Sequence, residues 1–150
     1  MIKTILYMLV LAAVLVCPTK ATDVGKLQPL QTIAVYRDED GYAVLTDTDD
    51  AGRGGSIDSA IDNLKATTPA TIYLDTAQYL IVDDESVIDS IRPHLKKSVK
   101  LCRFVGRPPM KTVSKFLSAH KVDITLGDWQ VGANLPVLDC TKDRLKFFRK

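Results

Sequence analysis

The alternation of strand-like and helix-like segments after Leu30 is the feature that most constrains the fold. Segments rich in β-branched and aromatic residues are separated by segments whose apolar residues recur at helical spacing. The order is ββ-α-β(β)-α-β-α. This order predicts a mixed β-sheet with helices packed on it, in the α+β or α/β class. We expect one such domain over residues 22–141, followed by a basic tail over 142–150.

Turn residues and β-formers predict the individual strands. Leu30–Tyr36 and Tyr42–Thr46 flank the turn signal Asp38-Glu39-Asp40-Gly41 and are predicted to form a hairpin. The polar, glycine-rich residues 47–55 are predicted to form a loop. Further extended segments are predicted at 71–74 and 79–82, as one bent strand or two, and at 98–105 and 134–138.

Three helices follow from the spacing of apolar residues and from their caps. We predict helices from Ile57, capped by Ser56, to Thr68-Pro69; from Asp84 or Ser86 to about Leu95, shortened or kinked by Pro93; and from 106–109 to about His120. The expected core contains Ile57, Ile61, Leu64, Ile72, Leu74, Leu80, Val82, Leu101, Val105, Val113 and Leu117.

The N-terminal segment from Met1 to Ala21 has the pattern of a secretory signal peptide. Lys3 gives it a positive start, and residues 5–16 form an apolar run that is shorter than the ~20 residues needed to span a bilayer. Small residues precede a cut after Ala21. Cys17 raises lipidation as an alternative, although Val16 stands where a lipobox has a small residue. The chain is therefore expected to be secreted, or membrane-associated outside the cytoplasm.

Two cysteines, Cys102 and Cys140, remain after the expected cleavage. An exported chain can join them in one disulfide, which would contribute roughly 3–4 kcal/mol on the chain-entropy model. Strand alternation places Cys102 opposite Leu101 and Val105, on what we expect to be the more accessible face. Two unpaired thiols are the alternative.

Charge is divided sharply along the chain. Residues 22–90 contain 4 Lys/Arg against 14 Asp/Glu, a net −10, whereas residues 91–150 contain 14 against 4, a net +10. The two halves can attract each other within one fold, or the basic half can face an anionic partner. The densest basic segment also has apolar residues between its charges, which suits an anionic membrane surface, and a frayed tail is the alternative. Its candidate contact residues are Lys142, Arg144, Lys146, Phe147, Phe148, Arg149 and Lys150.

The sequence contains no recognisable catalytic frame. His94 and His120 lie at helix ends without zinc-ligand spacing, and no nucleophile elbow or phosphate-binding loop is present. Asp83-Asp84-Glu85 reads as a turn before a helix. We therefore expect no enzyme activity, no cofactor and no metal site.

The middle of the chain resembles a known family. Residues 54–64, 71–82, 86–95 and 98–105 are similar, in pattern and order, to the N-terminal domain of spore-germination receptor C subunits, the Ger(x)C family. The resemblance covers roughly residues 30–120. It implies an exported, non-enzymatic domain of a spore-forming Gram-positive bacterium, with a role related to spore germination.

These observations lead to one main expectation and two alternatives. The main expectation is a non-catalytic binding or assembly domain whose partner is an unidentified protein or an anionic membrane surface, and not nucleic acid. A small secreted enzyme, such as a hydrolase, should instead show a concave site where titratable side chains converge. A peptide-binding or inhibitor-like domain should show a free sheet edge.

Overall fold

The computed structural model describes residues 2–16, 27–142 and 144–148. Helix α1 spans Ile2–Val16 within the expected signal peptide. The predicted cut after Ala21 and the alternative lipidation site at Cys17 lie outside the described residues. In the part of the chain that is described, no helix is both long enough and apolar enough to cross a membrane.

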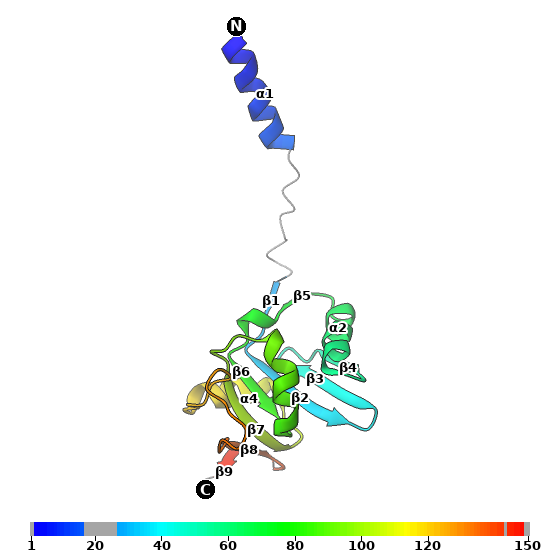
Figure 1. Cartoon of the computed structure of the whole chain (residues 1–150), viewed down its shortest axis with the longest axis vertical. Helices are drawn as coiled ribbons and strands as arrows, with labels where there is room; N and C mark the ends of the chain where they lie inside the picture. Colours follow the sequence, from blue (N-terminus) through cyan, green and yellow to red (C-terminus); the bar gives the residue numbers. More distant parts are fainter. Residues whose placement is uncertain (1, 17–26, 143, 149–150) are drawn as a thin grey trace.

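A seven-stranded mixed sheet forms the centre of the domain (Figure 1), which confirms the predicted class. The strands lie in the order β4-β3-β2-β6-β7-β8-β9. Strands β2, β6, β7 and β8 are parallel, and β3, β4 and β9 extend the sheet in antiparallel pairing. Their bounds are β2 Thr32–Asp38, β3 Gly41–Thr46, β4 Ala51–Gly54, β6 Tyr79–Val82, β7 Lys100–Gly106, β8 Val137–Cys140 and β9 Lys146–Phe148.

The two segments at 71–82 are separate strands in separate sheets. Strand β5 (Thr71–Tyr73) pairs in parallel with β1 (Leu27–Pro29), and β6 enters the main sheet. The single turn of 3-10 helix at Leu74–Thr76 divides them. The predicted hairpin of β2 and β3 is confirmed.

The glycine-rich segment after this hairpin is predicted from its sequence to be a loop throughout. In the structure it contains strand β4. The strand pairs with β3 and lies under helix α2 (Ile57–Thr67). A side chain at Gly52 would collide with the Ala60 carbonyl and the Leu64 side chain. The glycines that look like loop residues in the sequence therefore permit close packing of a strand against a helix.

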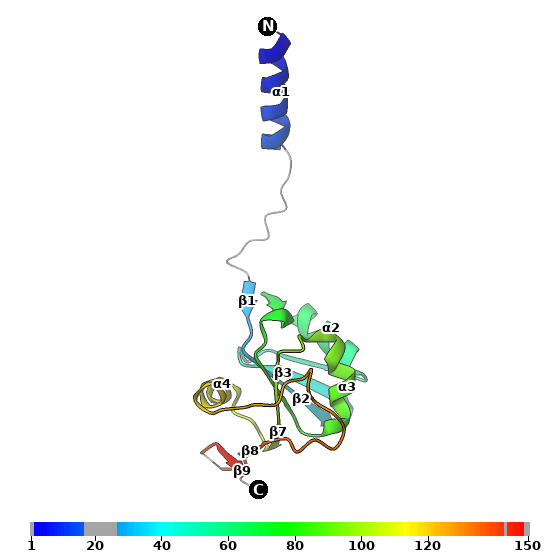
Figure 2. The ribbon, with the colours of Figure 1, turned by 60° about the vertical axis from the view of Figure 1, so that its left-hand side comes forward.

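Helices cover both faces of the sheet (Figure 2). Helices α2 and α3 (Ile88–Ile91) lie on one face and α4 (Met110–Ala119) on the other. Ser56 caps α2 as predicted, since its Oγ accepts from the Ser59 amide at 3.1 Å. The second predicted helix is interrupted: 3-10 turns at Glu85–Val87, capped by Asp84, and at Arg92–His94, around Pro93, flank α3.

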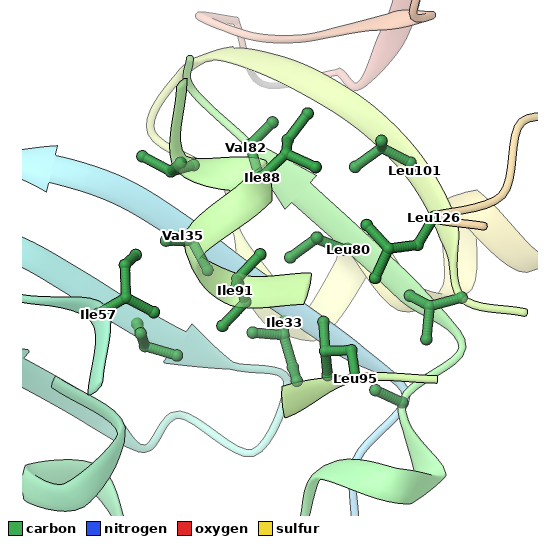
Figure 3. Packing of buried hydrophobic residues seen from close by; sticks show 14 of the residues in the cluster. Ile33, Val35, Ile57, Leu80, Val82, Ile88, Ile91, Leu95, Leu101 and Leu126 are labelled. Atoms are coloured by element: carbon green, nitrogen blue, oxygen red, sulfur yellow. The ribbon is translucent and has the colours of Figure 1, made fainter. Parts of the chain in front are cut away.

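Two apolar clusters result, one on each face of the central strands. The first, under α2 and α3, contains Ile33, Leu80 and Leu101 (Figure 3). The second, under α4, contains Ile81, Cys102 and Phe104. Because strand side chains alternate between faces, strands with helices on both sides must be apolar at nearly every position.

Nine of the eleven expected core residues are buried, and two are not. Leu74 is half-buried and packs against the first cluster. Val105 is 43% exposed because it lies near the carboxyl end of β7, beyond the helices that cover Leu101 on the same face.

Leu101 and Val105 lie on the same strand but differ in burial, so substituting each one tests the assigned core. We expect Leu101→Ala to lower the free energy of unfolding by about 2–5 kcal/mol, because it removes a fully buried side chain. Val105→Ala should cost no more than about 1 kcal/mol, because the side chain already contacts water. Urea unfolding of both variants measures the two values, and equal losses would contradict the difference in burial between Leu101 and Val105.

Candidate binding surface around strand β9

The basic C-terminal segment contains a strand of the main sheet, in place of the expected tail. Strand β9 pairs antiparallel with β8, and Leu138 lies opposite Phe147. Phe147 and Leu145 pack against the second cluster, which holds the strand to the domain. Strand β9 lies at the end of the domain opposite β1 (Figure 1 and Figure 2). Of the predicted contact residues, Arg149 and Lys150 lie outside the described residues.

The order of strands in the sheet keeps the strands of the acidic half of the chain next to one another and those of the basic half next to one another. Strands β2, β3, β4 and β6 come from the acidic half, and β7, β8 and β9 from the basic half. The two halves therefore lie side by side, in contact between β6 and β7. Lys111 and Asp49 form one ion pair across the halves at 2.6 Å. This arrangement is compatible with attraction between the two halves within the fold. It is also compatible with a basic surface that faces an anionic partner.

Three cations converge beside β9. Lys142, Arg144 and Lys146 are exposed, and together with Thr141 they line a hollow of about 500 Å³. Among the described residues, none of these three side chains takes part in an ion pair. We name these three residues, together with Phe147 and Phe148, the basic edge surface.

The nearby carboxylate of Asp139 is engaged locally. The Thr141 hydroxyl donates to its Oδ1 at 2.6 Å and the Thr141 amide donates to the same atom at 2.9 Å. These bonds, and secondarily the charges of Lys142 and Lys146, hold the pKa of Asp139 below its ordinary value. The carboxylate is thus fixed in the turn after β8 and forms no ion pair with the described cations.

The two phenylalanines of β9 point to opposite faces of the sheet. Phe147 is half-buried beside α4, with its ring centroid 5.3 Å from that of Phe116, which in turn stacks on His120 at 3.9 Å. Phe148 is 54% exposed on the other face, in register with Val137. Each aromatic side chain therefore borders a different hollow.

Hollows lie on both faces of β9. One, of about 780 Å³, is lined by Phe148 together with Arg103, Ile124 and Val137. The other, of about 590 Å³, is lined by Phe147, Leu145 and Phe116. Lys121 borders both hollows. The carboxylates of Glu85 and Asp123 also line the first hollow, so its charges are mixed. The second hollow has an apolar wall beside Lys121 and Lys146, which suits ligands that carry both apolar and negatively charged groups.

Cys102 and Cys140 are free thiols in the structure, which agrees with the alternative of two unpaired thiols and not with the possible disulfide. The β7–β8 register places Gly106, not Cys102, opposite Cys140. Cys102 lies four residues before Gly106 on β7. At ~3.3 Å per residue, Cys102 is therefore displaced by about 13 Å along the strand from the residue that faces Cys140, which exceeds the reach of a disulfide. Cys102 is only 1% exposed, so its predicted accessible position is also wrong: α4 covers that face of the sheet.

Burial also makes these thiols unreactive. It raises the pKa of Cys102 to about 12 and that of Cys140 to about 11. The thiolate, which is the reactive form, is therefore scarce at neutral pH in the folded protein.

The histidines and the acidic turn have structural roles. His94 Nε2 lies 2.6 Å from Asp58 Oδ1 and links the end of the second helical segment to α2. Asp83 accepts from the amides of Arg37 and Asp84 through its two carboxylate oxygens. In the described part of the chain, no three His, Cys, Asp or Glu side chains are grouped to hold a metal ion.

Sequence reasoning missed one further hollow, of about 300 Å³, at the carboxyl ends of the parallel strands. Asp38, Asp83, Arg53 and Arg107 line it together with Phe104. The chain leaves β6 toward α3 on one face and leaves β7 toward α4 on the other, an arrangement that often creates a ligand crevice. Here the acids already have partners, because Asp38 pairs with Arg53 at 3.3 Å and Asp83 accepts backbone amides. Only the three-dimensional order of the strands brings these residues together.

Comparison with family models, with curated proteins and with solved structures found no match to this chain.

The state of the thiols can be tested by counting them. We expect two reactive thiols per expected mature chain when the protein is unfolded without reductant, because Cys102 and Cys140 are free. The folded protein should label far more slowly at pH 8, because burial keeps both thiols protonated. Mass spectrometry after alkylation counts the labels, and an unlabelled unfolded chain would show that the disulfide forms after all.

Proposed function

We propose that this chain is an exported, non-catalytic binding or assembly domain that holds an anionic partner on its basic edge surface. The convergence of Lys142, Arg144 and Lys146 on one hollow carries the proposal. Lys146 lies on β9, and Lys142 and Arg144 lie in the connection between β8 and β9, so the folded domain presents them together. A fixed group of like charges also loses less conformational freedom on binding than a flexible tail does.

The chemistry of this surface is that of binding through charge and apolar contact. Each exposed cation contributes about 1 kcal/mol near an anionic surface, so three together can hold a partner that has matching charges. Phe148 and the walls of the neighbouring hollows add apolar area beside the charges. Such an attraction weakens as salt is added.

The compartment and the biological setting are part of the proposal. The signal-peptide pattern of residues 1–21 supports a place outside the cytoplasm. The resemblance of residues 30–120 to the Ger(x)C family supports a spore-forming Gram-positive source and a role related to spore germination. Partners in that compartment are an unidentified protein or an anionic membrane surface, and exposed Phe148 beside the cations offers apolar contact area to either.

Export gives a direct test. We expect mass spectrometry of the secreted protein to find an N-terminus near Thr22, because small residues precede the bond after Ala21. A chain that keeps Met1 and accumulates in the cytoplasm would exclude export.

The basic edge surface can be tested with a charge-matched pair of variants. Lys142→Gln/Arg144→Gln/Lys146→Gln should abolish salt-sensitive binding to immobilised poly-L-glutamate or to phosphatidylglycerol vesicles, because it removes the converging charges. The control, Lys65→Gln/Lys96→Gln/Lys97→Gln, changes the net charge equally at exposed positions elsewhere.

Retention on the glutamate column and co-sedimentation with vesicles measure the two interactions, with phosphatidylcholine vesicles as the neutral comparison. We expect the control to bind nearly as well as the unmodified protein. Equal losses in both triple variants, or no binding of the unmodified protein to either anionic probe, would refute the proposal.

A further inference from the structure

We infer that β9 accepts an extended, acidic segment of a partner protein, which adds to the sheet beside β9 as a further strand. This inference rests on the proposed function and names the partner of the same surface. In this mode of recognition, main-chain hydrogen bonds supply affinity and side-chain hollows supply selectivity.

The two edges of the sheet differ in how they are protected. At the β4 edge, α2 packs over the strand and the Arg53 amide donates to Asn63 Oδ1 at 3.1 Å. Strand β9 is the last strand at the other edge, and among the described residues no hydrogen bond from an element other than β8 reaches it. Unpaired main-chain groups on an edge strand are a ready template for another strand.

The surroundings of β9 match the geometry of an added strand. Successive side chains of a strand point to opposite faces of the sheet. A segment lying beside β9 would therefore direct neighbouring side chains to opposite faces of the sheet, one toward the side of Phe148 and the other toward the side of Phe147. The β9 side chains on the two faces, Phe148 and Phe147, are both apolar, which indicates that the central pair of residues in the partner is apolar.

Charge specifies the residues on either side of that apolar pair. Lys146 lies on β9 itself and Lys142 and Arg144 precede it, whereas Lys121 already pairs with Asp123 at 3.3 Å. An extended segment that lies beside β9 passes these cations, so Asp or Glu residues flanking its apolar pair gain complementary contacts. Basic residues at the same positions would be repelled.

The same geometry disfavours a bilayer as the main partner. An interfacial segment presents its apolar side chains on one side, toward the lipid. Phe148 points to one face of the sheet, but Phe147 points to the other and is half-buried beside Phe116 and His120. Only one of the two aromatic side chains can enter a membrane at a time, whereas a strand uses both faces.

The test uses a capped synthetic peptide, Glu-Glu-Leu-Phe-Glu-Glu, and the purified exported protein. We expect binding in low salt by calorimetry, and slower amide hydrogen exchange at β9 when the peptide is bound. A peptide with N-methylated Leu and Phe keeps every charge but lacks the central main-chain donors. It should bind at least about fivefold more weakly, because one of two consecutive N–H groups points to the neighbouring strand and a lost hydrogen bond costs ~1 kcal/mol.

Two variants of the protein test the hollow on the exposed face. Phe148→Ser removes a wall of that hollow and should weaken peptide binding about fivefold or more, since it removes exposed apolar contact area. Val131→Ser, at a loop residue that is 84% exposed, is the matched control and should leave affinity unchanged. Both positions are exposed enough for the fold to survive the change.

The outcomes separate this inference from the proposed function. Equal affinity of the N-methylated peptide, or equal binding of the charge-reversed peptide Lys-Lys-Leu-Phe-Lys-Lys, would overturn strand addition. Binding to phosphatidylglycerol vesicles without binding to the peptide would also overturn it, while the proposed function stands. Failure of vesicles, polyglutamate and peptide together would overturn both.

Discussion

The burial of both faces of the central strands is the constraint on which the rest of the structure depends. Strand β6 is buried along its whole length, with Leu80 facing α2 and α3 and Ile81 facing α4. A strand in this position has no solvated side, so each flanking helix must stay in place for the other face to remain covered. Helix α4 is fastened by a polar contact as well, because the Ser114 hydroxyl donates to Thr32 Oγ1 at 2.8 Å.

The edges of this sheet, in contrast, are specialised. Helix α2 and the Asn63 side chain cover the β4 edge, and Gly52 makes that close approach sterically possible. At the other edge, the chain adds β9 after the helical layers are complete, with cations on it and hollows on both of its faces. The proposed binding function therefore sits where the sheet is least enclosed, and its test does not depend on disturbing the core.

The order of strands also gives meaning to the division of charge along the chain. Acidic and basic halves could have been interleaved in the sheet, which would have cancelled their fields at short range. In the sheet, the strands of the two halves lie on either side of the β6–β7 contact, and helical elements of the basic half, such as α4 with its Lys111–Asp49 pair, reach across to the acidic half. Separated charge of this kind orients a protein toward an anionic partner before contact is made.

The sequence by itself determined the elements whose signals are local: the β2–β3 hairpin, the Ser56 cap, the apolar stripe of α2 and the mixed sheet class. Local signals suffice there because turn residues, caps and helical periodicity act over a few residues. Only the tertiary structure decided that β4 is a strand, that Cys102 and Cys140 are buried apart, and that residues 146–148 extend the sheet. In each case a distant element determines the outcome: α2 covers Gly52, α4 covers Cys102, and β8 pairs with a segment whose charges alone suggest a solvated tail.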